Sequence, residues 1–409
     1  MKRIAIITPG VLPVPAIKGG AVESLIDQYI HFNREKKQYH LTVFSIFDPA
    51  LSSRNDETTE YFYIRNNPIL SFFDRCISLF QRVFLKKKNA TTFKNLLYRY
   101  RYFLGVKKAL EEQDFDLVIL ENHCSEFLCL KTKKLQQKYE GKVVFHSHNV
   151  PAHYRRVIRW MSCLKTIYSV SQALSSLWER ALAESLPHVS FRVLRNGIDT
   201  SLFAPKTESD ILAQAKSRFH LPKDKKIVLF AGRMTKMKGI FSVIEAMRYL
   251  PEDYFLLLAG DYFYGVKAKN AESIEIQKSL ASIEGRFSFT GYVDHSEMPL
   301  VYSISDIVVL PSIEFDSAPL VLIEGISCCK PIITTNIGGI PEYSKGAGVL
   351  VLEIDGNLSK TIAEKVLTIT NDLTLYQQMV QQSQDARPFL DDATYSKHYS
   401  EMISDNLEL

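Results

Sequence analysis

Two cations stand close together in a glycine-containing segment of the second half of the chain. Gly232-Arg233 follows an apolar run, and Lys238-Gly239 precedes a helix-length amphipathic stretch at 240–250. Arginine binds phosphate oxygens through two parallel N–H bonds and lysine adds a compact charge, while glycines let a phosphate approach the start of a helix. The segment therefore predicts that Arg233 and Lys238 bind a diphosphate. An ordinary exposed basic loop is the alternative, but it leaves the glycines unexplained.

A second polar segment, residues 311–325, joins an apolar run to a helix. We expect Asp316 or Ser317 to cap this helix and Ala318-Pro319-Leu320 to present backbone amides to a ligand. Glu324 lies within apolar sequence, where a carboxylate without a partner would be costly to bury. Its partner is predicted to be the ribose of a nucleotide or, alternatively, an internal arginine or backbone amide.

The first half of the chain offers a similar but weaker signal. Gly19-Gly20 stands between the first apolar run and a helix, so the pair either lets a phosphate approach the helix N-terminus or only makes a turn. Asp114-Phe115-Asp116 matches a metal-binding D-x-D on paper. Because it immediately precedes a buried strand, we interpret it as a turn and predict no metal site.

These segments must be positioned by two α/β domains. Short apolar runs alternate with amphipathic stretches, which is typical of parallel sheets with crossover helices. Ligands of such sheets bind beyond the carboxyl ends of the strands, so two facing Rossmann-like domains would place a site in the cleft between them. The runs that we expect to be strands are 4–7, 41–46, 117–120, 143–146, 166–170 and 191–194, then 226–230, 255–259, 287–289, 307–310, 331–334 and 348–351.

Length and composition agree with a two-domain soluble protein. The 409 residues exceed one usual core, and a net charge of +5 is too small to argue for nucleic acid. The six cysteines lack metal-type pairing and are expected to be reduced and buried. With no signal-peptide pattern and no apolar stretch of spanning length, we expect a cytoplasmic protein.

Positive charge is concentrated at residues 72–108, where basic and aromatic side chains alternate. Such a segment either lies on the anionic inner face of the plasma membrane or forms ordinary surface helices whose aromatic residues face the core. The residues concerned are Arg75, Arg82, Lys86, Lys87, Lys88, Lys94, Arg99, Arg101, Lys107 and Lys108, with Phe72, Phe73, Phe80, Phe84, Phe93, Tyr98 and Tyr102.

Taken together and in order, the motifs resemble the retaining GT-B glycosyltransferases of the E-x7-E type, the group 1 enzymes of capsule, lipopolysaccharide and mannoside synthesis. The resemblance covers nearly the whole chain. It implies an acceptor-binding domain at 1–200 with a C-terminal helix at 390–409 that crosses back, and a nucleotide-sugar domain at 201–389. The matching motifs are Gly19-Gly20, Asn196-Gly197-Ile198-Asp199 with Phe203, Gly232-Arg233 to Lys238-Gly239, Gly291-Tyr292-Val293, Pro311-Ser312 and Gly338-Gly339-Ile340-Pro341-Glu342.

The resemblance also implies roles for single residues of the nucleotide-sugar domain. Glu324 would bind the ribose, Arg233 and Lys238 the diphosphate, and Tyr292-Val293 would border the base. The first glutamate of the E-x7-E pattern is replaced by Asp316, which keeps the charge on a shorter side chain; Glu314 stands two residues too early.

Three histidines of the first half are candidates for a further family role. His148 fits the family histidine that lies near the sugar hydroxyls, where a neutral imidazole would orient the donor. A structural role is expected for His146. His123 either borders the acceptor or is a structural histidine.

The implied reaction is retaining transfer of a hexosyl unit from a nucleotide-sugar, with UDP favoured, to a saccharide acceptor that is lipid-linked. No divalent metal is expected, because Arg233, Lys238 and helix N-termini would stabilise the leaving diphosphate. The alternatives are a non-catalytic GT-B subunit, a sugar-nucleotide epimerase and a relative of glycogen or starch synthases. The substitution at Asp316 lends some weight to the first of these, whereas the presence of Arg233, Lys238 and Glu324 counts against it.

Overall fold

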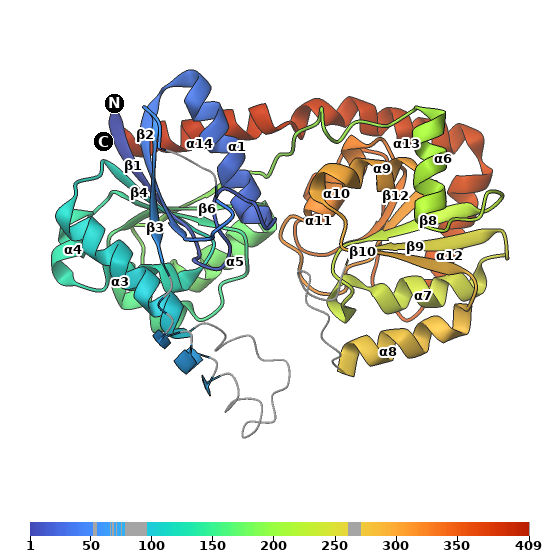
Figure 1. Ribbon diagram of the computed structural model, residues 1–409, viewed down its shortest axis with the longest axis horizontal. Coiled ribbons are helices and arrows are strands. Elements are labelled where there is room, and N and C mark those ends of the chain that lie inside the picture. The colour runs from blue at the N-terminus through green and yellow to red at the C-terminus, as the bar shows by residue number, and fades with distance from the viewer. Residues whose placement is uncertain are drawn as a thin grey trace. The chain divides into compact units, whose positions relative to one another are not determined.

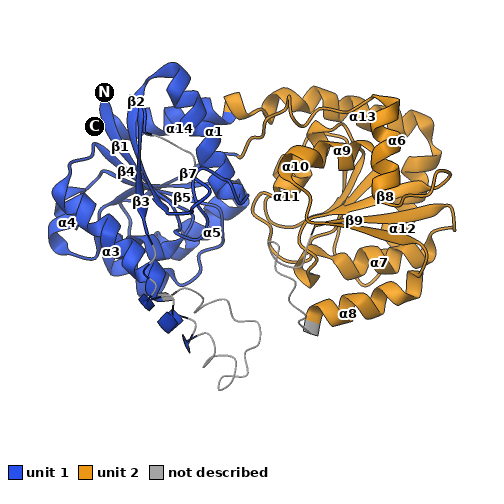
Figure 2. Ribbon diagram, viewed as in Figure 1, with its two compact units in different colours: residues 1–195, 395–409 blue, residues 196–394 orange. Residues whose placement is uncertain are grey.

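The structure, a computed structural model, describes residues 1–51, 55–65, 67, 69–70, 72–74, 76–77, 96–260 and 271–408. The chain divides into two compact units, shown in Figure 2. Unit 1 comprises Met1–Arg195 and Tyr395–Leu409, and unit 2 comprises Asn196–Thr394. The division falls near the sequence-based boundaries at 200 and 390, and the end of the chain returns to the first unit.

Unit 1 contains a seven-stranded parallel sheet in the order β3-β2-β1-β4-β5-β6-β7. The strand order reverses between β1 and β4, which are adjacent in the sheet. Its strands are β1 (Lys2–Ile7), β2 (Tyr39–Ile46), β3 (Thr59–Ile64), β4 (Leu117–Glu121), β5 (Val143–Ser147), β6 (Leu164–Ser169) and β7 (Ser190–Val193). The α-helices with described bounds are α1 (Ala21–Lys36), α3 (Leu96–Glu112), α4 (Lys133–Lys138) and α5 (Gln172–Leu182), with α14 (Asp392–Leu407) at the C-terminus.

Unit 2 has a six-stranded parallel sheet in the order β10-β9-β8-β11-β12-β13, with its reversal between β8 and β11. Its strands are β8 (Lys226–Ala231), β9 (Tyr254–Ala259), β10 (Phe287–Gly291), β11 (Ile307–Leu310), β12 (Ile332–Thr335) and β13 (Val349–Leu352). Its α-helices are α6 (Ser209–Arg218), α7 (Ile240–Tyr249), α8 (Ala271–Leu280), α9 (Met298–Ser303), α10 (Leu320–Ser327), α11 (Ile340–Ser344), α12 (Leu358–Asn371) and α13 (Leu373–Ala386).

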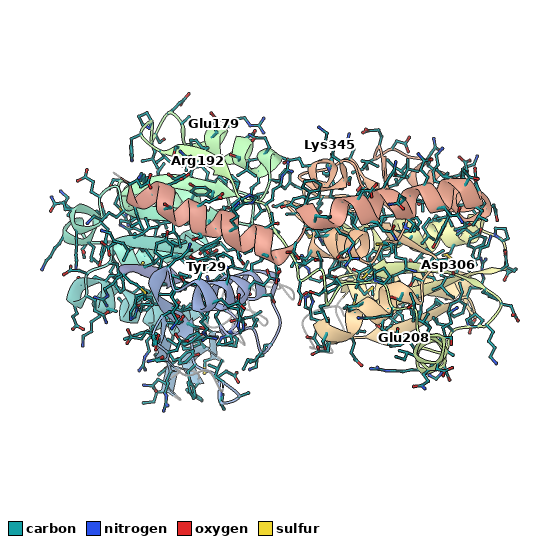
Figure 3. All side chains as sticks on the ribbon, turned by 90° about the horizontal axis from the view of Figure 1, so that it is seen from above. Tyr29, Glu179, Arg192, Glu208, Asp306 and Lys345 are labelled. Carbon is teal, nitrogen blue, oxygen red and sulfur yellow. The ribbon has the colours of Figure 1, made fainter. Side chains whose placement is uncertain are left out.

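The apolar strands are buried because helices cover both faces of each sheet. Along β8, Ile227 and Leu229 pack into the core beneath α6, α9 and α10, whereas Val228 and Phe230 pack beneath α7, α8 and α12 (Figure 1). This alternation explains why the strand reads as a continuous apolar run in the sequence. Asp306, labelled in Figure 3, accepts a hydrogen bond from the Ile227 amide at 2.6 Å and so ties the start of β11 to β8.

The C-terminal helix α14 supplies part of the core of unit 1. Its residues Tyr395, Tyr399, Met402 and Ile403 pack with α1 and with strands β1, β2 and β4. Tyr29, labelled in Figure 3, lies on α1 with its ring centroid 4.3 Å from that of Tyr399. The helix is therefore an integral element of unit 1 rather than a loose tail.

The predicted α/β class and every predicted strand are confirmed, but β3 was missed. β3 pairs only with β2 at the edge of the sheet, and half of its residues are partly exposed. The more exposed strands β7 and β10 were nevertheless predicted, so exposure alone does not explain why β3 was missed. Among the described residues, no helix combines the length and apolarity needed to cross a membrane. All six cysteines are free thiols; five are buried as expected, whereas Cys76 is exposed.

Replacing Gly348 by alanine is expected to destabilise unit 2. A Cβ at this position would lie 1.9 Å from the backbone oxygen of Met379, so β13 or α13 must shift. Overpacking of this kind costs about 1–3 kcal/mol, and each kcal/mol lowers the melting temperature by roughly 2–4 °C. Thermal unfolding followed by circular dichroism measures the change. Gly356→Ala is the matched control because nothing lies within 4 Å of its Cβ position; equal melting temperatures for the two variants would contradict the packing argument.

Candidate active site

In unit 2 the predicted phosphate-binding residues lie at the point where the strand order reverses. Lys238 follows β8 and Asp316 follows β11, the two adjacent strands of the reversal. The Lys238 ammonium pairs with the Asp316 carboxylate, which also accepts a hydrogen bond from the Ser312 hydroxyl at 3.2 Å. Asp316, and not the exposed Glu314, thus lies beside the lysine. This carboxylate belongs to the cation site, so the expectation that it caps α10 is wrong.

Arg233 differs from Lys238 in having an exposed side chain without an ion-pair partner among the described residues. It follows Gly232, whose φ of +127° directs the chain away from β8. A Cβ on Gly232 would meet nothing within 4 Å, although the Gly232 backbone oxygen lies close to Gly260, where an added Cβ would approach it to 2.1 Å. The guanidinium is thus available to an anionic ligand at the carboxyl end of the sheet.

The loops after β8, β11 and β12 approach one another closely through their backbones. A Cβ on Gly239 would lie 1.8 Å from the Pro311 oxygen, and one on Gly338 would lie 2.2 Å from the Asp316 oxygen. The Gly339 amide also donates to the Asp316 oxygen at 2.8 Å. Asp316 is therefore fixed at its backbone by the third loop and at its side chain by the first.

Glu324 lies on α10 and is 5 % exposed. The Tyr302 hydroxyl donates to its Oε2 at 2.9 Å, and Nδ1 of His295 lies 3.8 Å from its Oε1. Burial raises the pKa of Glu324, while His295 and the Tyr302 hydrogen bond oppose this shift. The partner is thus neither an arginine nor a backbone amide, and one carboxylate oxygen faces a half-exposed imidazole.

The segment at Ala318-Pro319-Leu320 starts α10 without a side-chain cap. Pro319 itself occupies the N-cap position, and no side chain bonds to the first amides. The backbone oxygen of Ala318 accepts from the side-chain amide of Asn196 at 3.5 Å. The first amides of α10 thus have no side-chain cap among the described residues.

Tyr292 and Val293 directly follow β10. Tyr292 is 57 % exposed, whereas Val293 is buried. Two residues later His295 turns toward Glu324 and lies against Phe203, with ring centroids 4.8 Å apart. His295 was missed in the sequence, although it immediately follows the Gly291-Tyr292-Val293 motif. It connects that motif to Glu324.

In unit 1, Gly19 and Gly20 make the turn that begins α1, with φ values of +69° and +109°. Glu23 folds back over this turn, because a Cβ on Gly20 would lie 2.3 Å from its Oε2. Burial raises the pKa of Glu23 to about 7; its own backbone amide opposes the shift, and Glu121 adds to it. The Glu23 carboxyl group thus lies over the N-terminus of α1, where a phosphate was one of the two alternatives suggested by the sequence.

Beside this turn, Glu121, His146 and His148 form a buried cluster at the ends of β4 and β5. His146 Nδ1 lies 3.0 Å from Glu121 Oε2, and His148 Nε2 lies 3.5 Å from the same oxygen. The two imidazole centroids are 4.3 Å apart, so both histidines lie on one side of β5. The donor atoms of the three residues lie within 4.8 Å of one another, a spacing that a divalent ion also tolerates.

The charges of this cluster follow from burial and proximity. Burial lowers the pKa of His148 to about 4, and His146 lowers it further, while Glu121 opposes the shift. Burial alone would raise the pKa of Glu121, but His146 and His148 outweigh it and hold the pKa at about 2. At neutral pH His148 is therefore a neutral imidazole beside a carboxylate.

His123, the third candidate, has a structural role. Its Nδ1 accepts from the Ser125 backbone amide at 3.4 Å, and its own backbone amide donates to Glu126 Oε1 at 2.9 Å. Together these contacts form a capping box at the start of the 3-10 helix Cys124–Leu130. Asp116 is structural too, as expected for a turn, because it accepts from the Arg3 amide at 2.8 Å.

The basic segment at 72–108 is described only in part. Tyr98 and Tyr102 are buried, as expected for helices that face the core, whereas Phe72 and Phe73 are 63 % and 50 % exposed. Arg99, Arg101, Lys107 and Lys108 lie on α3. Arg75, Phe80, Arg82, Phe84, Lys86, Lys87, Lys88, Phe93 and Lys94 lie outside the described residues.

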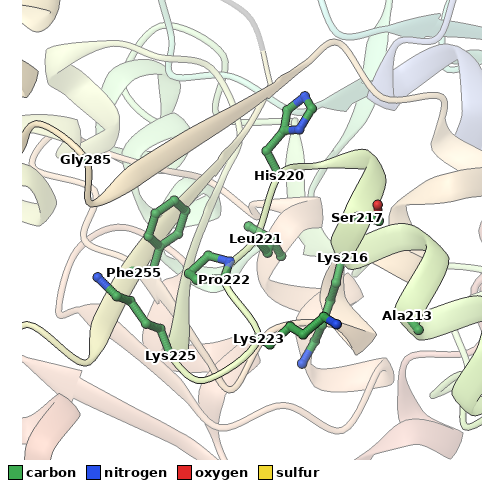
Figure 4. A pocket seen from close by; sticks show the side chains of 10 residues that line it. All are labelled: Ala213, Lys216, Ser217, His220, Leu221, Pro222, Lys223, Lys225, Phe255 and Gly285. Atoms are coloured by element: carbon green, nitrogen blue, oxygen red, sulfur yellow. The ribbon is translucent and has the colours of Figure 1, made fainter.

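A cavity of about 610 Å³ in unit 2 lies away from these residues (Figure 4). Lys225 and Gly285, which line it, precede β8 and β10, and Phe255, which also lines it, is the second residue of β9. It is therefore at the amino ends of the strands, opposite the edge where ligands of such sheets bind. We do not assign it to the candidate site.

Comparison with known proteins agrees with the arrangement of the two sheets and their motifs. Residues 213–386 match the family described as glycosyl transferases group 1. The matched residues make up most of unit 2. The chain is similar to HepE of Anabaena in complex with UDP-glucose, with a TM-score of 0.72, 17 % identity and coverage of 99 % of this chain and 100 % of that one. The fold of unit 1 and unit 2 is accordingly GT-B.

Two curated relatives extend the comparison beyond the matched segment. Spore coat protein SA of Bacillus subtilis is 24 % identical over 355 residues, which cover 83 % of this chain and 82 % of that protein. The processive diacylglycerol alpha-glucosyltransferase of Acholeplasma laidlawii is 26 % identical over 247 residues, covering 57 % of this chain and 70 % of that enzyme.

Glu23 is expected to make the stability of this protein pH-dependent. Its carboxyl group has a pKa of about 7 in the folded protein against an ordinary value of 4.5, so the folded state holds the extra proton between these values. Stability is therefore present at pH 4.5 and is lost as the pH rises to 7. Glu23→Gln should raise the free energy of unfolding at pH 8 by up to about 3 kcal/mol.

Denaturant unfolding of the wild type and of Glu23→Gln between pH 4.5 and 8 measures this effect. Glu35→Gln removes an exposed carboxylate from the same helix and serves as the control. Parallel pH profiles for wild type and Glu23→Gln would show that the Glu23 carboxyl does not titrate in this range.

Proposed function

We propose that this protein is a retaining glycosyltransferase that moves a hexosyl unit from a nucleotide-sugar to a lipid-linked saccharide acceptor without a divalent metal. The observation that carries the proposal is the arrangement of Arg233, Lys238 and Asp316 at the strand reversal of unit 2. A fixed lysine, an arginine without an ion-pair partner among the described residues and an uncapped helix start form a site suited to a diphosphate.

Each residue has a distinct part in donor binding. Lys238 has three N–H groups, so it can keep Asp316 as a partner and still bind a phosphate oxygen. Arg233 would bind the diphosphate through its guanidinium. Glu324 would accept hydrogen bonds from the ribose hydroxyls, and Tyr292 would border the base. UDP is favoured because HepE, which has the same fold, was determined with UDP-glucose.

The reaction requires no enzymic nucleophile. The bond between the sugar C1 and the diphosphate oxygen breaks, the acceptor oxygen bonds to C1 on the same face, and the acceptor proton passes to the departing phosphate. Arg233, Lys238 and the helix amides stabilise the charge that develops on the diphosphate, at about 3 kcal/mol for a well-placed donor. His148, a neutral imidazole, orients the sugar hydroxyls.

One prediction of this proposal concerns the nucleotide-sugar donor. In a thermal-shift panel of UDP-, GDP-, ADP- and dTDP-sugars with chelator, one UDP-sugar should raise the melting temperature. A ligand at a hundred times its dissociation constant contributes about 2.7 kcal/mol of stability. Arg233→Ala and Lys238→Ala should each abolish the shift, because the diphosphate loses a cation.

Arg248→Ala and Lys360→Ala provide matched controls, since they remove the same charges from exposed positions outside the 232–239 loop. The proposal fails if no nucleotide-sugar stabilises the wild type, which would favour a non-catalytic subunit. It also fails if the controls lose the shift as fully as the site variants. Release of an altered free sugar without acceptor would favour an epimerase, and NMR of the product anomer tests retention.

Another prediction of this proposal concerns the acceptor. A lipid-linked acceptor is supported by the basic and aromatic segment at 72–108 and by the relative named for a diacylglycerol acceptor. Replacing Lys86, Lys87 and Lys88 by alanine should weaken binding to phosphatidylglycerol vesicles and slow transfer to lipid-linked acceptors. The protein then has three fewer positive charges to attract it to the anionic lipid surface. Replacing Lys216, Lys223 and Lys225, which lie on unit 2 (Figure 4), removes three positive charges as a control. Equal vesicle binding by the two triple variants would contradict the proposal.

A further inference from the structure

We propose that Glu121 is a positioning residue for His148 and that Tyr399 of the C-terminal helix holds Glu121 in place. The inference rests on the proposed function, in which His148 faces the donor sugar. It adds two residues that the sequence did not suggest, one at the end of β4 and one on α14. Neither residue needs to touch the sugar.

Both oxygens of the Glu121 carboxylate are committed. Oε1 accepts a hydrogen bond from the Tyr399 hydroxyl at 2.6 Å, and Oε2 faces the rings of His146 and His148 at 3.0 and 3.5 Å. The residue is 1 % exposed. Because bulk water cannot replace a lost partner at such a site, the side chain has little freedom to turn away.

The pairing of strands in the sheet brings the Glu121 carboxylate next to His146 and His148. β4 and β5 are parallel neighbours, and Glu121 is the register partner of His146. His148 lies two residues further along the chain and so returns to the same side. Although β5 ends at Ser147, one residue before His148, the ring centroids of His146 and His148 are 4.3 Å apart.

Glu121 selects the form of His148 that can serve the sugar. A neutral imidazole carries one N–H and one acceptor nitrogen, and a carboxylate beside Nε2 favours the proton on that nitrogen. Nδ1 is then the nitrogen that can accept a hydrogen bond from a sugar hydroxyl. The separation of 3.5 Å is long for a hydrogen bond, as is common before substrate binds.

Tyr399 is well suited to fix the carboxylate. Its ring packs against Tyr29 at 4.3 Å and Tyr395 at 5.9 Å, which holds the hydroxyl in one place. Burial raises the pKa of Tyr399 well above its ordinary value, so the hydroxyl remains a donor. The helix that carries it begins at Asp392, three residues before the chain re-enters unit 1.

The test compares Glu121→Gln and Tyr399→Phe with Tyr139→Phe. The first replaces a charge by an isosteric amide, and the second removes one hydroxyl. Tyr139→Phe is the matched control, since that buried hydroxyl donates to the Leu110 and Gln113 oxygens instead. Melting temperatures establish that all three variants are folded.

The first readout is the ring-nitrogen NMR spectrum of His148 at pH 7, which does not depend on activity. The wild type should show mainly the Nε2–H tautomer, and Glu121→Gln should shift the population toward Nδ1–H. In activity assays we expect kcat to fall by at least about 10-fold in Glu121→Gln and less in Tyr399→Phe, with a smaller change in KM for the donor. Tyr139→Phe should keep the wild-type kcat and tautomer.

Three outcomes would overturn the inference. An unchanged tautomer in Glu121→Gln would show that Glu121 does not set the state of His148. A kcat in Tyr139→Phe as low as in Tyr399→Phe would indicate loss of packing alone. One bound metal ion per chain in the wild type, lost in Glu121→Gln, would assign the cluster to a metal instead. Absence of transfer by the wild type would count against the proposed function, while the tautomer measurement would still decide the role of Glu121.

Discussion

Close backbone contact between three loops is the constraint on which the site of unit 2 depends. The loops after β8, β11 and β12 approach so closely that a Cβ on Gly239 or Gly338 would overlap a backbone oxygen of the 311–316 loop. Both glycines also have positive φ, at +76° and +60°. Only glycine meets both requirements without strain. Because of this contact, Lys238 and Asp316 meet although they are 78 positions apart in the chain.

The ion pair of Lys238 and Asp316 explains how an aspartate can occupy the first position of the E-x7-E pattern, where the family has a glutamate. An aspartate reaches one methylene less far than a glutamate, yet here its backbone is brought toward the lysine by Gly338 and Gly339. The pair is partly buried. Before a ligand binds, the Asp316 carboxylate balances the positive charge of Lys238. Arg233 lacks such a partner among the described residues and adds to the positive character of the loop.

Unit 1 meets a different requirement, because it buries carboxylates rather than cations. Glu121 is ionised and has hydrogen-bonding partners from two elements, His146 on β5 and Tyr399 on α14. The buried carboxyl group of Glu23 avoids an unpaired charge differently, because it stays protonated up to about pH 7. Burial favours the neutral form of a carboxyl group, so the number of nearby donors decides which of the two states each one adopts.

The sequence by itself determined the α/β class, the inner strands and the segments at the carboxyl ends of β8, β10 and β11. These follow from local patterns: fully buried strands are continuously apolar, and glycine, arginine and lysine at a helix start have few other uses. The edge strand β3 was missed, although the edge strands β7 and β10, in which no residue is fully buried, were predicted. Only the tertiary structure decided that Asp316 pairs with Lys238, that Tyr302 and His295 are the neighbours of Glu324, and that Tyr399 reaches Glu121 across 278 positions. Such contacts depend on which strands are neighbours and where helices pack against them, and no periodicity in the sequence records distances between segments that are remote along the chain.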